Sequence, residues 1–136
     1  MWTDWDLDAC LDNNDIGISP SDITAILAVW EGENDEDDWR WIVQLTDGQF
    51  ALIQGWCDYT GWDCQSGARV HRGDSPEDAI AAAMGQERFW EGEWALPEHV
   101  LTSLRDQLVN GKKKTWREET DEKFGITSKY LPRAFV

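Results

Sequence analysis

The stretch "WRWIVQLTDGQFALIQGW" at residues 39–56 places two β-prone segments on either side of Asp47-Gly48. An Asp-Gly pair between such segments is the strongest short-range signal for a β-hairpin. A two-residue turn at this pair predicts four cross-strand neighbours: Leu45 with Phe50, Val43 with Leu52, Ile42 with Ile53, and Trp39 with Trp56.

Further elements extend outward from this hairpin. The apolar run at 23–30 predicts a strand before it, and residues 66–73 supply a short fourth strand after it. Helical patterns and capping residues predict four helices: 4–12 capped by Thr3, 75–85 capped by Ser75 and ended by Gly85, 97–111 ended by Asn110-Gly111, and 115–125. We expect an α+β fold, a three- or four-stranded antiparallel meander with mostly C-terminal helices packed on one face.

The length of 136 residues is typical of a single domain. We divide it into an acidic N-terminal segment (1–22), the sheet (23–72) and a helical part (75–136). Ten Trp residues are more than one small core comfortably hides, so some of them are expected to be partly exposed.

Charge is spread unevenly along the chain, whose formal net charge is −15. Residues 1–38 hold twelve acids and no Lys or Arg, whereas residues 99–136 hold five acids and eight bases. Phosphate would be repelled by the acidic part, so a basic protein is a better partner for it than nucleic acid. A role in solubility alone is the competing interpretation.

The sequence contains no apolar run long enough to span a membrane, and its start, "MWTDWDLDAC", is acidic where a signal peptide is basic. These features predict a protein of the cytoplasm, without a membrane partner. In that compartment the three Cys are expected to be reduced.

The loop "GWCDYTGWDCQS" at 55–66 concentrates scarce residue types. A zinc site could use Cys57, Cys64 and His71, with Cys10 or His99 as the fourth ligand, although six residues between the two Cys exceed the usual spacing. A disulfide between Cys57 and Cys64 is a second alternative. We favour a structural loop without metal, in which buried thiols act as small hydrophobes. Its residues are Trp56, Cys57, Asp58, Tyr59, Trp62, Asp63 and Cys64.

Residues 38–70, with the "WRW" strand, the Asp-Gly hairpin and the motif G-x-C-D-Y-T-G-W-D-C-Q-S, resemble a segment of small proteins from tailed phages and prophages. That group has no established function. The resemblance covers about a quarter of the chain. It implies a phage or mobile-element origin, and it supplies no catalytic residues.

Neither catalysis nor cation binding is indicated. The segment "DNNDIG" at 12–17 begins like a calcium-binding EF-hand loop, but Ile16 and Ile23 stand where oxygen ligands are required. No nucleophile, phosphate-binding or zinc-protease motif occurs, and His71 and His99 are isolated in the sequence. We expect a protein that is not an enzyme and has no cofactor.

These observations favour an acidic protein that binds a basic, nucleic-acid-binding host protein and blocks it, as an anti-CRISPR or other anti-defence DNA mimic does. The residues expected to make the contact are Glu31, Glu33, Asp35, Glu36, Asp37 and Asp38, with Trp30 and Trp39 on either side. A solvated hairpin tip is the competing interpretation of this loop. The alternative functions are a Trp-lined module for a nucleotide or sugar and a phage particle or assembly protein.

Overall fold

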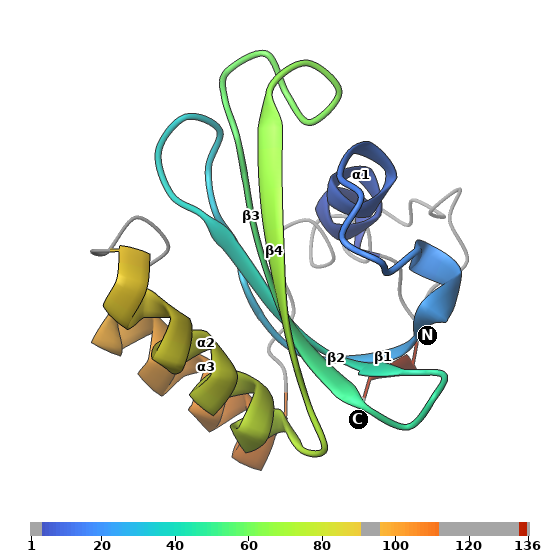
Figure 1. Cartoon of the computed structure of the whole chain (residues 1–136), viewed down its shortest axis with the longest axis vertical. Coiled ribbons are helices and arrows are strands. Elements are labelled where there is room, and N and C mark those ends of the chain that lie inside the picture. Colours follow the sequence, from blue (N-terminus) through green and yellow to red (C-terminus); the bar gives the residue numbers. More distant parts are fainter. Residues whose placement is uncertain (1–3, 91–95, 112–133, 136) are drawn as a thin grey trace, which may run out of the picture.

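The computed structural model describes residues 4–90, 96–111 and 134–135. It contains a central sheet with helices on both sides (Figure 1). The elements in chain order are α1 (Trp5–Asn13), the 3-10 turn η1 (Pro20–Asp22), β1 (Ile23–Trp30), β2 (Trp39–Leu45), β3 (Phe50–Cys57), β4 (Ser66–Gly73), α2 (Pro76–Trp90), α3 (Glu98–Asn110) and β5 (Ala134–Phe135).

The predicted α+β class is confirmed. Strands β1 to β4 form an antiparallel meander, and the full strand order is β4-β3-β2-β1-β5. The short β5 was not predicted; it pairs parallel to β1 at Ala25 and Ile26. Two residues are too short a segment to show a strand periodicity, so only the tertiary structure reveals this pairing.

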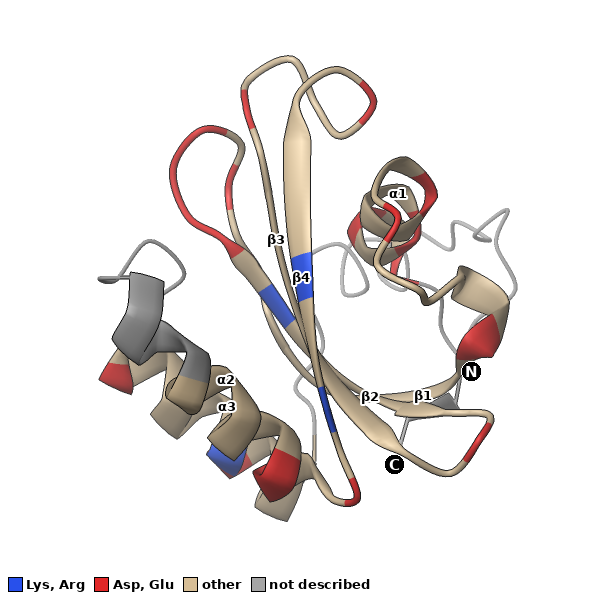
Figure 2. Cartoon of the chain, in the orientation of Figure 1, with Lys and Arg blue, Asp and Glu red and all other residues tan. Residues whose placement is uncertain are grey.

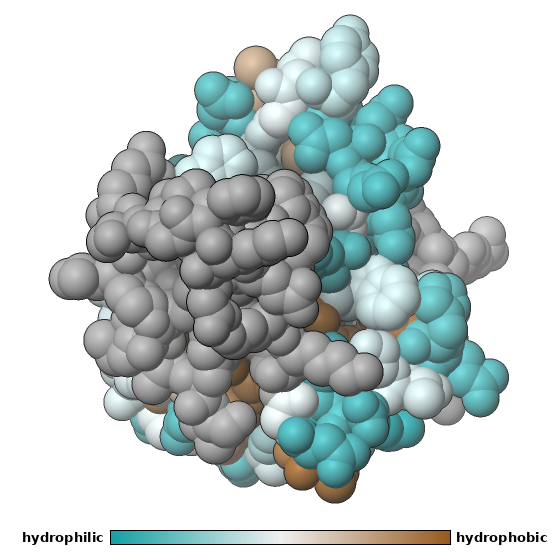
Figure 3. Space-filling view, turned by 180° about the vertical axis from the view of Figure 1, so that it is seen from behind, coloured by the Kyte–Doolittle hydropathy of each residue, from teal (hydrophilic) through white to brown (hydrophobic). Residues whose placement is uncertain are grey.

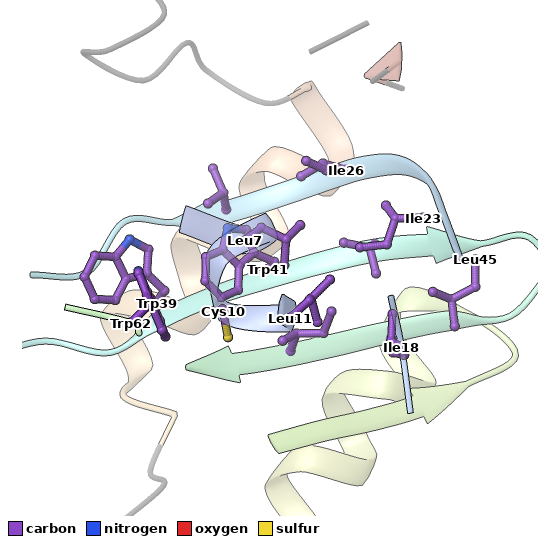
Figure 4. Packing of buried hydrophobic residues seen from close by; sticks show 14 of the residues in the cluster. Leu7, Cys10, Leu11, Ile18, Ile23, Ile26, Trp39, Trp41, Leu45 and Trp62 are labelled. Carbon is purple, nitrogen blue, oxygen red and sulfur yellow. The ribbon is translucent and has the colours of Figure 1, made fainter. Parts of the chain in front are cut away.

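The two faces of the sheet carry separate apolar cores. As predicted, α2 and α3 pack together on one face, over Ile42 and Leu52. Helix α1 covers the opposite face, where Leu7 and Cys10 meet Trp41 (Figure 4). Because β1, β2 and β3 are buried on both sides, most of their residues are apolar, and strict alternation is lost.

The predicted register of the central hairpin is wrong by one residue. Val43 pairs with Ala51, Ile42 with Leu52, and Trp39 with Gly55. The turn is a three-residue loop, closed by a hydrogen bond from Leu45 N to Gln49 O of 2.8 Å, with Gly48 at a φ of +88°. Asp-Gly also suits this loop type, in which glycine takes the left-handed position next to a bulge.

Helix ends agree with the prediction in part. The side chain of Ser75 accepts a hydrogen bond from Asp78 N at 3.1 Å, and Gly111 follows α3 at a φ of +88°, both as expected. The cap of α1 is Asp4 instead of Thr3, which lies outside the described residues. Helix α2 continues past Gly85, since glycine lowers helix stability without necessarily ending a helix. The predicted helix at 115–125 lies outside the described residues.

Gln107 of α3 fixes that helix on the edge of β1. Its side-chain oxygen accepts a hydrogen bond from Val29 N, and its amide nitrogen donates one to Val29 O, both at 2.9 Å. The side chain thus replaces a neighbouring strand at this position, and it is only 9% exposed. Both backbone groups of Val29 would otherwise be buried without a partner.

We expect Gln107→Ala to lower the free energy of unfolding by about 1–3 kcal/mol, because two buried backbone groups lose their hydrogen bonds. Urea denaturation followed by Trp fluorescence measures this change. The control is Asn110→Ala, whose amide bonds the exposed Asp106 on the same helix and should change stability by less than about 0.5 kcal/mol. Equal effects of the two substitutions would contradict the role assigned to Gln107.

Candidate functional site

The acidic loop between β1 and β2 has a defined conformation. Glu33 N donates to Asp37 O at 2.9 Å, and Glu36 N donates to Glu33 O at 3.1 Å. Asp35 N donates to Cys57 O at 2.8 Å, which anchors the loop to the end of β3. Asp35 adopts a φ of +62°, a conformation that Asp tolerates better than most residues. The loop is therefore an ordered structure built against the sheet.

Two of its acids serve the protein's own structure. Asp37 accepts hydrogen bonds from the Trp30 indole at 2.9 Å and from the Arg40 guanidinium at 3.3 Å. The carbonyl of Asp38 accepts another from Arg40 at 3.2 Å. Arg40 is only 4% exposed, so the Asp37 carboxylate and the Asp38 carbonyl help to stabilise its buried charge. Asp37 and Asp38 are thus tied to the protein's own cation.

The other four predicted acids, Glu31, Glu33, Asp35 and Glu36, are exposed. A hydrogen bond shared with Glu33, together with repulsion between the two carboxylates, raises the pKa of Glu36 above its ordinary value. Burial raises the pKa of Asp38, and nearby Arg40 partly opposes that shift. The outward part of the loop is therefore a crowded negative surface that a cation would stabilise.

The two flanking Trp residues have different environments. Trp39 is 4% exposed, and its ring centroid lies 5.0 Å from that of Trp62 in the core, so the prediction that it offers an exposed aromatic contact is wrong. Trp30 is partly buried and packs edge-on against His99 at 5.3 Å. The sequence could not distinguish these positions, because both flank the same polar loop.

Two aromatic residues of the 55–66 segment are exposed. Trp56 is 37% exposed and lies over Gly67 of the neighbouring strand, and Tyr59 at the loop tip is 80% exposed. The bond from Asp35 to Cys57 brings them beside the acidic loop. We call this surface the acidic end; its residues are Glu31, Glu33, Asp35, Glu36, Trp56, Asp58, Tyr59 and Asp63.

The remainder of the 55–66 segment forms a turn that leads back to the sheet, and Cys64 is exposed, so the expectation of a buried thiol is wrong at that position. Asp58 accepts hydrogen bonds from the backbone and the hydroxyl of Thr60, and Gly61 takes a φ of +99°. Trp62 then turns inward and is 5% exposed, with its ring near Trp39 and Trp41 (Figure 4).

Two carboxylates of the N-terminal segment accept hydrogen bonds from the buried indoles of Trp41 and Trp62. Asp4 is 5% exposed; it accepts hydrogen bonds of 2.9 Å from Leu7 N, as the helix cap, and from the Trp41 indole. Asp6 accepts one from the Trp62 indole at 3.2 Å. Each indole N–H thereby gains the partner that burial requires. Asp4 and Asp6 therefore position α1 on the sheet.

All three cysteines are free thiols, so the disulfide alternative is wrong. Cys10 and Cys57 are buried, and Cys64 is exposed. Burial, with smaller effects of nearby Cys57 and acids, raises the pKa of Cys10 to about 12, and burial raises that of Cys57 to about 11. Within residues 4–90, 96–111 and 134–135, no three His, Cys, Asp or Glu side chains are grouped to hold a metal ion. His71, a ligand in the zinc alternative, is 7% exposed, and burial lowers its pKa.

A shallow hollow of about 610 Å³ lies between α1 and η1. Its lining includes Asp12, Asn14, Asp15 and Asp22 and contains no Trp among the described residues. It therefore lacks the aromatic platforms that a stacking site for a nucleotide or sugar would use. The described surface on the back of the molecule is mostly hydrophilic, with only small apolar spots (Figure 3).

Acidic residues are concentrated in the β1–β2 loop and along α1, whereas the few described basic residues lie mainly on β2 and β4 (Figure 2). None of the helices in the described ranges is both long enough and apolar enough to cross a membrane.

No protein-family model matches this chain, and no significant match was found among curated proteins or among solved structures.

We expect Asp4→Ala to lower the free energy of unfolding by about 2–4 kcal/mol. It removes the cap of α1 and leaves the buried Trp41 indole without its partner. Chemical denaturation measures the loss. The control Asp12→Ala, near the exposed end of the same helix, should be neutral or slightly stabilising, since an acid is unfavourable there. A loss equal to that of Asp12→Ala would show that Asp4 does not hold the helix in place.

Thiol accessibility tests the cysteine arrangement. In the native protein at pH 8, a chromogenic disulfide reagent should react rapidly with Cys64 alone, because Cys10 and Cys57 are buried and remain protonated well above that pH. After unfolding in denaturant without reductant, all three should react. Detection of only one thiol in the unfolded chain would mean that a disulfide is present.

Proposed function

We propose that this protein is a non-enzymatic binder of a basic protein surface, in which the carboxylates of the acidic end take the place of nucleic-acid phosphates. The observation that carries the proposal is that the β1–β2 loop has a fixed conformation. Its backbone is fixed by hydrogen bonds at Glu33, Asp35 and Glu36, so its exposed charges are held in place before binding. Preorganised charge reduces the entropy that a partner must overcome.

Aromatic residues supply the second half of such an interface. Tyr59 and Trp56 lie beside the loop acids, and large exposed rings of these types dominate the binding energy of many protein interfaces. They take the role that the sequence assigned to Trp30 and Trp39. Asp37 and Asp38 contribute indirectly, because they hold the loop through Trp30 and Arg40.

The net charge of −15 extends the attraction beyond the contact itself. It would draw a basic partner in from a distance and would repel free nucleic acid. The resemblance to phage proteins makes a host nucleic-acid-binding protein the natural target, in the cytoplasm of the host. Inhibition of a defence complex, of the anti-CRISPR or a related type, is the form of this activity that such an origin favours.

A Trp-lined module for a small ligand has less support. Trp39, Trp41 and Trp62 are packed in the core, and the hollow beside α1 has no Trp in its described lining. A particle or assembly role would require a symmetric contact between copies.

A matched pair of charge-reversal variants tests the proposal. Glu33→Lys with Glu36→Lys changes two exposed acids of the loop and leaves Asp35, Asp37 and Asp38, which shape it, intact. Asp74→Lys with Asp106→Lys makes the same change in net charge at exposed sites outside the acidic end. Tagged forms of each would be used to capture proteins from a nuclease-treated bacterial lysate, with elution by increasing NaCl.

We expect native protein and the Asp74/Asp106 variant to retain a basic protein that moderate salt releases and that added duplex DNA displaces. The Glu33/Glu36 variant should bind it at least about tenfold more weakly at low salt. Equal binding by both variants would remove the loop from the interface. Capture that resists both salt and DNA would refute the phosphate-mimic mechanism.

A further inference from the structure

Trp56 is held in place by a residue without a side chain. It pairs with Gly67 across β3 and β4, and an added Cβ on Gly67 would lie 2.4 Å from the indole Nε1, 2.8 Å from Cε2 and 3.1 Å from Cζ2. The indole therefore packs against bare backbone. It remains 37% exposed, so part of the ring is open to a partner in a position that is fixed before binding.

The Trp56 indole makes no hydrogen bond that holds the elements of the chain together. Trp30, Trp41 and Trp62 each donate their indole N–H to a carboxylate of the chain itself. Within the described ranges, Trp56 has no such acceptor. Large rings that are exposed in this way are typical of the residues that dominate protein interfaces.

A carboxylate oxygen is available on the same side of the sheet. Asp58 N donates to Gln65 O at 3.1 Å, which continues the β3–β4 register by one residue. Trp56 and Asp58 therefore point to the same side, about 7 Å apart along the strand. Asp58 Oδ1 accepts hydrogen bonds from the backbone and the hydroxyl of Thr60, whereas Oδ2 has no donor among the described residues.

Two acidic loops, β1–β2 and β3–β4, meet at this position. Asp35 N donates to Cys57 O at 2.8 Å, which brings the exposed acids of the β1–β2 loop beside the residue that follows Trp56. Figure 2 shows acidic residues on both loops at this end of the sheet. Arg69 lies two positions from Gly67 on β4, but it is partly buried and already engaged within the chain. A cation is therefore the partner that the local charge favours.

The combination of ring and carboxylate favours one cation over others. A guanidinium is planar and weakly hydrated, so it can stack on an indole while its N–H groups pair with a carboxylate. A lysine ammonium is compact and strongly hydrated, so it forms the ion pair but gains less from the ring. A nucleobase would also stack, but its phosphate would be repelled by a chain of net charge −15.

We propose that Trp56 and Asp58 form a binding site for one arginine side chain of a basic protein. The guanidinium stacks on the exposed part of the Trp56 ring, and its N–H groups donate to Asp58 Oδ2. Gly67 positions the ring, and the acids of the β1–β2 loop attract the cation. This inference rests on the proposed function and names the side chain that the acidic end selects.

Two peptides of equal charge, hexa-arginine and hexa-lysine, test the site in calorimetric titrations at low salt. Native protein should bind hexa-arginine more tightly, in part because guanidinium groups pair well with any exposed carboxylate. Trp56→Leu should reduce the ratio of the two dissociation constants by about two- to fivefold, the range of a cation–π contact at an exposed site. The control Trp56→Phe keeps an aromatic ring and should reduce the ratio less.

Gly67→Ala is a second variant, which keeps Trp56 but displaces its ring, because the added Cβ would overlap the indole. The ratio should fall as it does in Trp56→Leu, with native circular dichroism. Asp58→Asn removes the charge that pairs with the guanidinium and should weaken hexa-arginine binding more than hexa-lysine binding. Asp63→Asn makes the same charge change at an exposed position of the same loop and should leave the ratio unchanged.

The peptides also separate this inference from the proposed function. A ratio that is the same in native protein, Trp56→Leu and Gly67→Ala would overturn the arginine site. It would leave the proposed function standing, because both peptides would still bind the acidic end. Native protein that binds neither peptide at low salt would contradict the proposed function and the arginine site together.

Discussion

The structure depends on the absence of a side chain at position 55. An added Cβ there would lie 2.8 Å from the Cys10 sulfur and 3.0 Å from the Trp62 ring. Because Gly55 has no side chain, the Trp62 ring can pack against its backbone. There Trp62 also contacts Trp39, which pairs with Gly55 across the two strands. This one contact joins the β3–β4 loop, helix α1 and the central hairpin. The unusual composition of the 55–66 segment follows from it, since the segment must both turn sharply and return a large ring to the core.

Buried polar groups then determine how each helix sits on the sheet. On one face, Asp4 connects the first turn of α1 to the Trp41 indole. On the other face, Gln107 of α3 binds both backbone groups of Val29. Apolar packing alone would allow a helix to slide along the strands at modest cost. A buried polar group left without a partner costs much more, so these two residues specify one arrangement on each face.

Much of this fold could be predicted from local sequence, and the failures share a cause. The strand at 66–73 and the cap at Ser75 follow from patterns within a few residues. The predicted hairpin register was wrong because Asp47-Gly48 fits two loop lengths, and local sequence does not choose between them; in the structure Trp39 pairs with Gly55. The position of α1 also depends on tertiary contacts, which no periodicity records.

The candidate surface shows the same limit. The sequence indicated an exposed acidic loop. It could not show that Asp37, although exposed like Glu33 and Glu36, also binds Trp30 and Arg40. Nor could it show that Tyr59 is exposed and Trp39 is not. Both distinctions depend on tertiary hydrogen bonds and ring packing, which composition does not record.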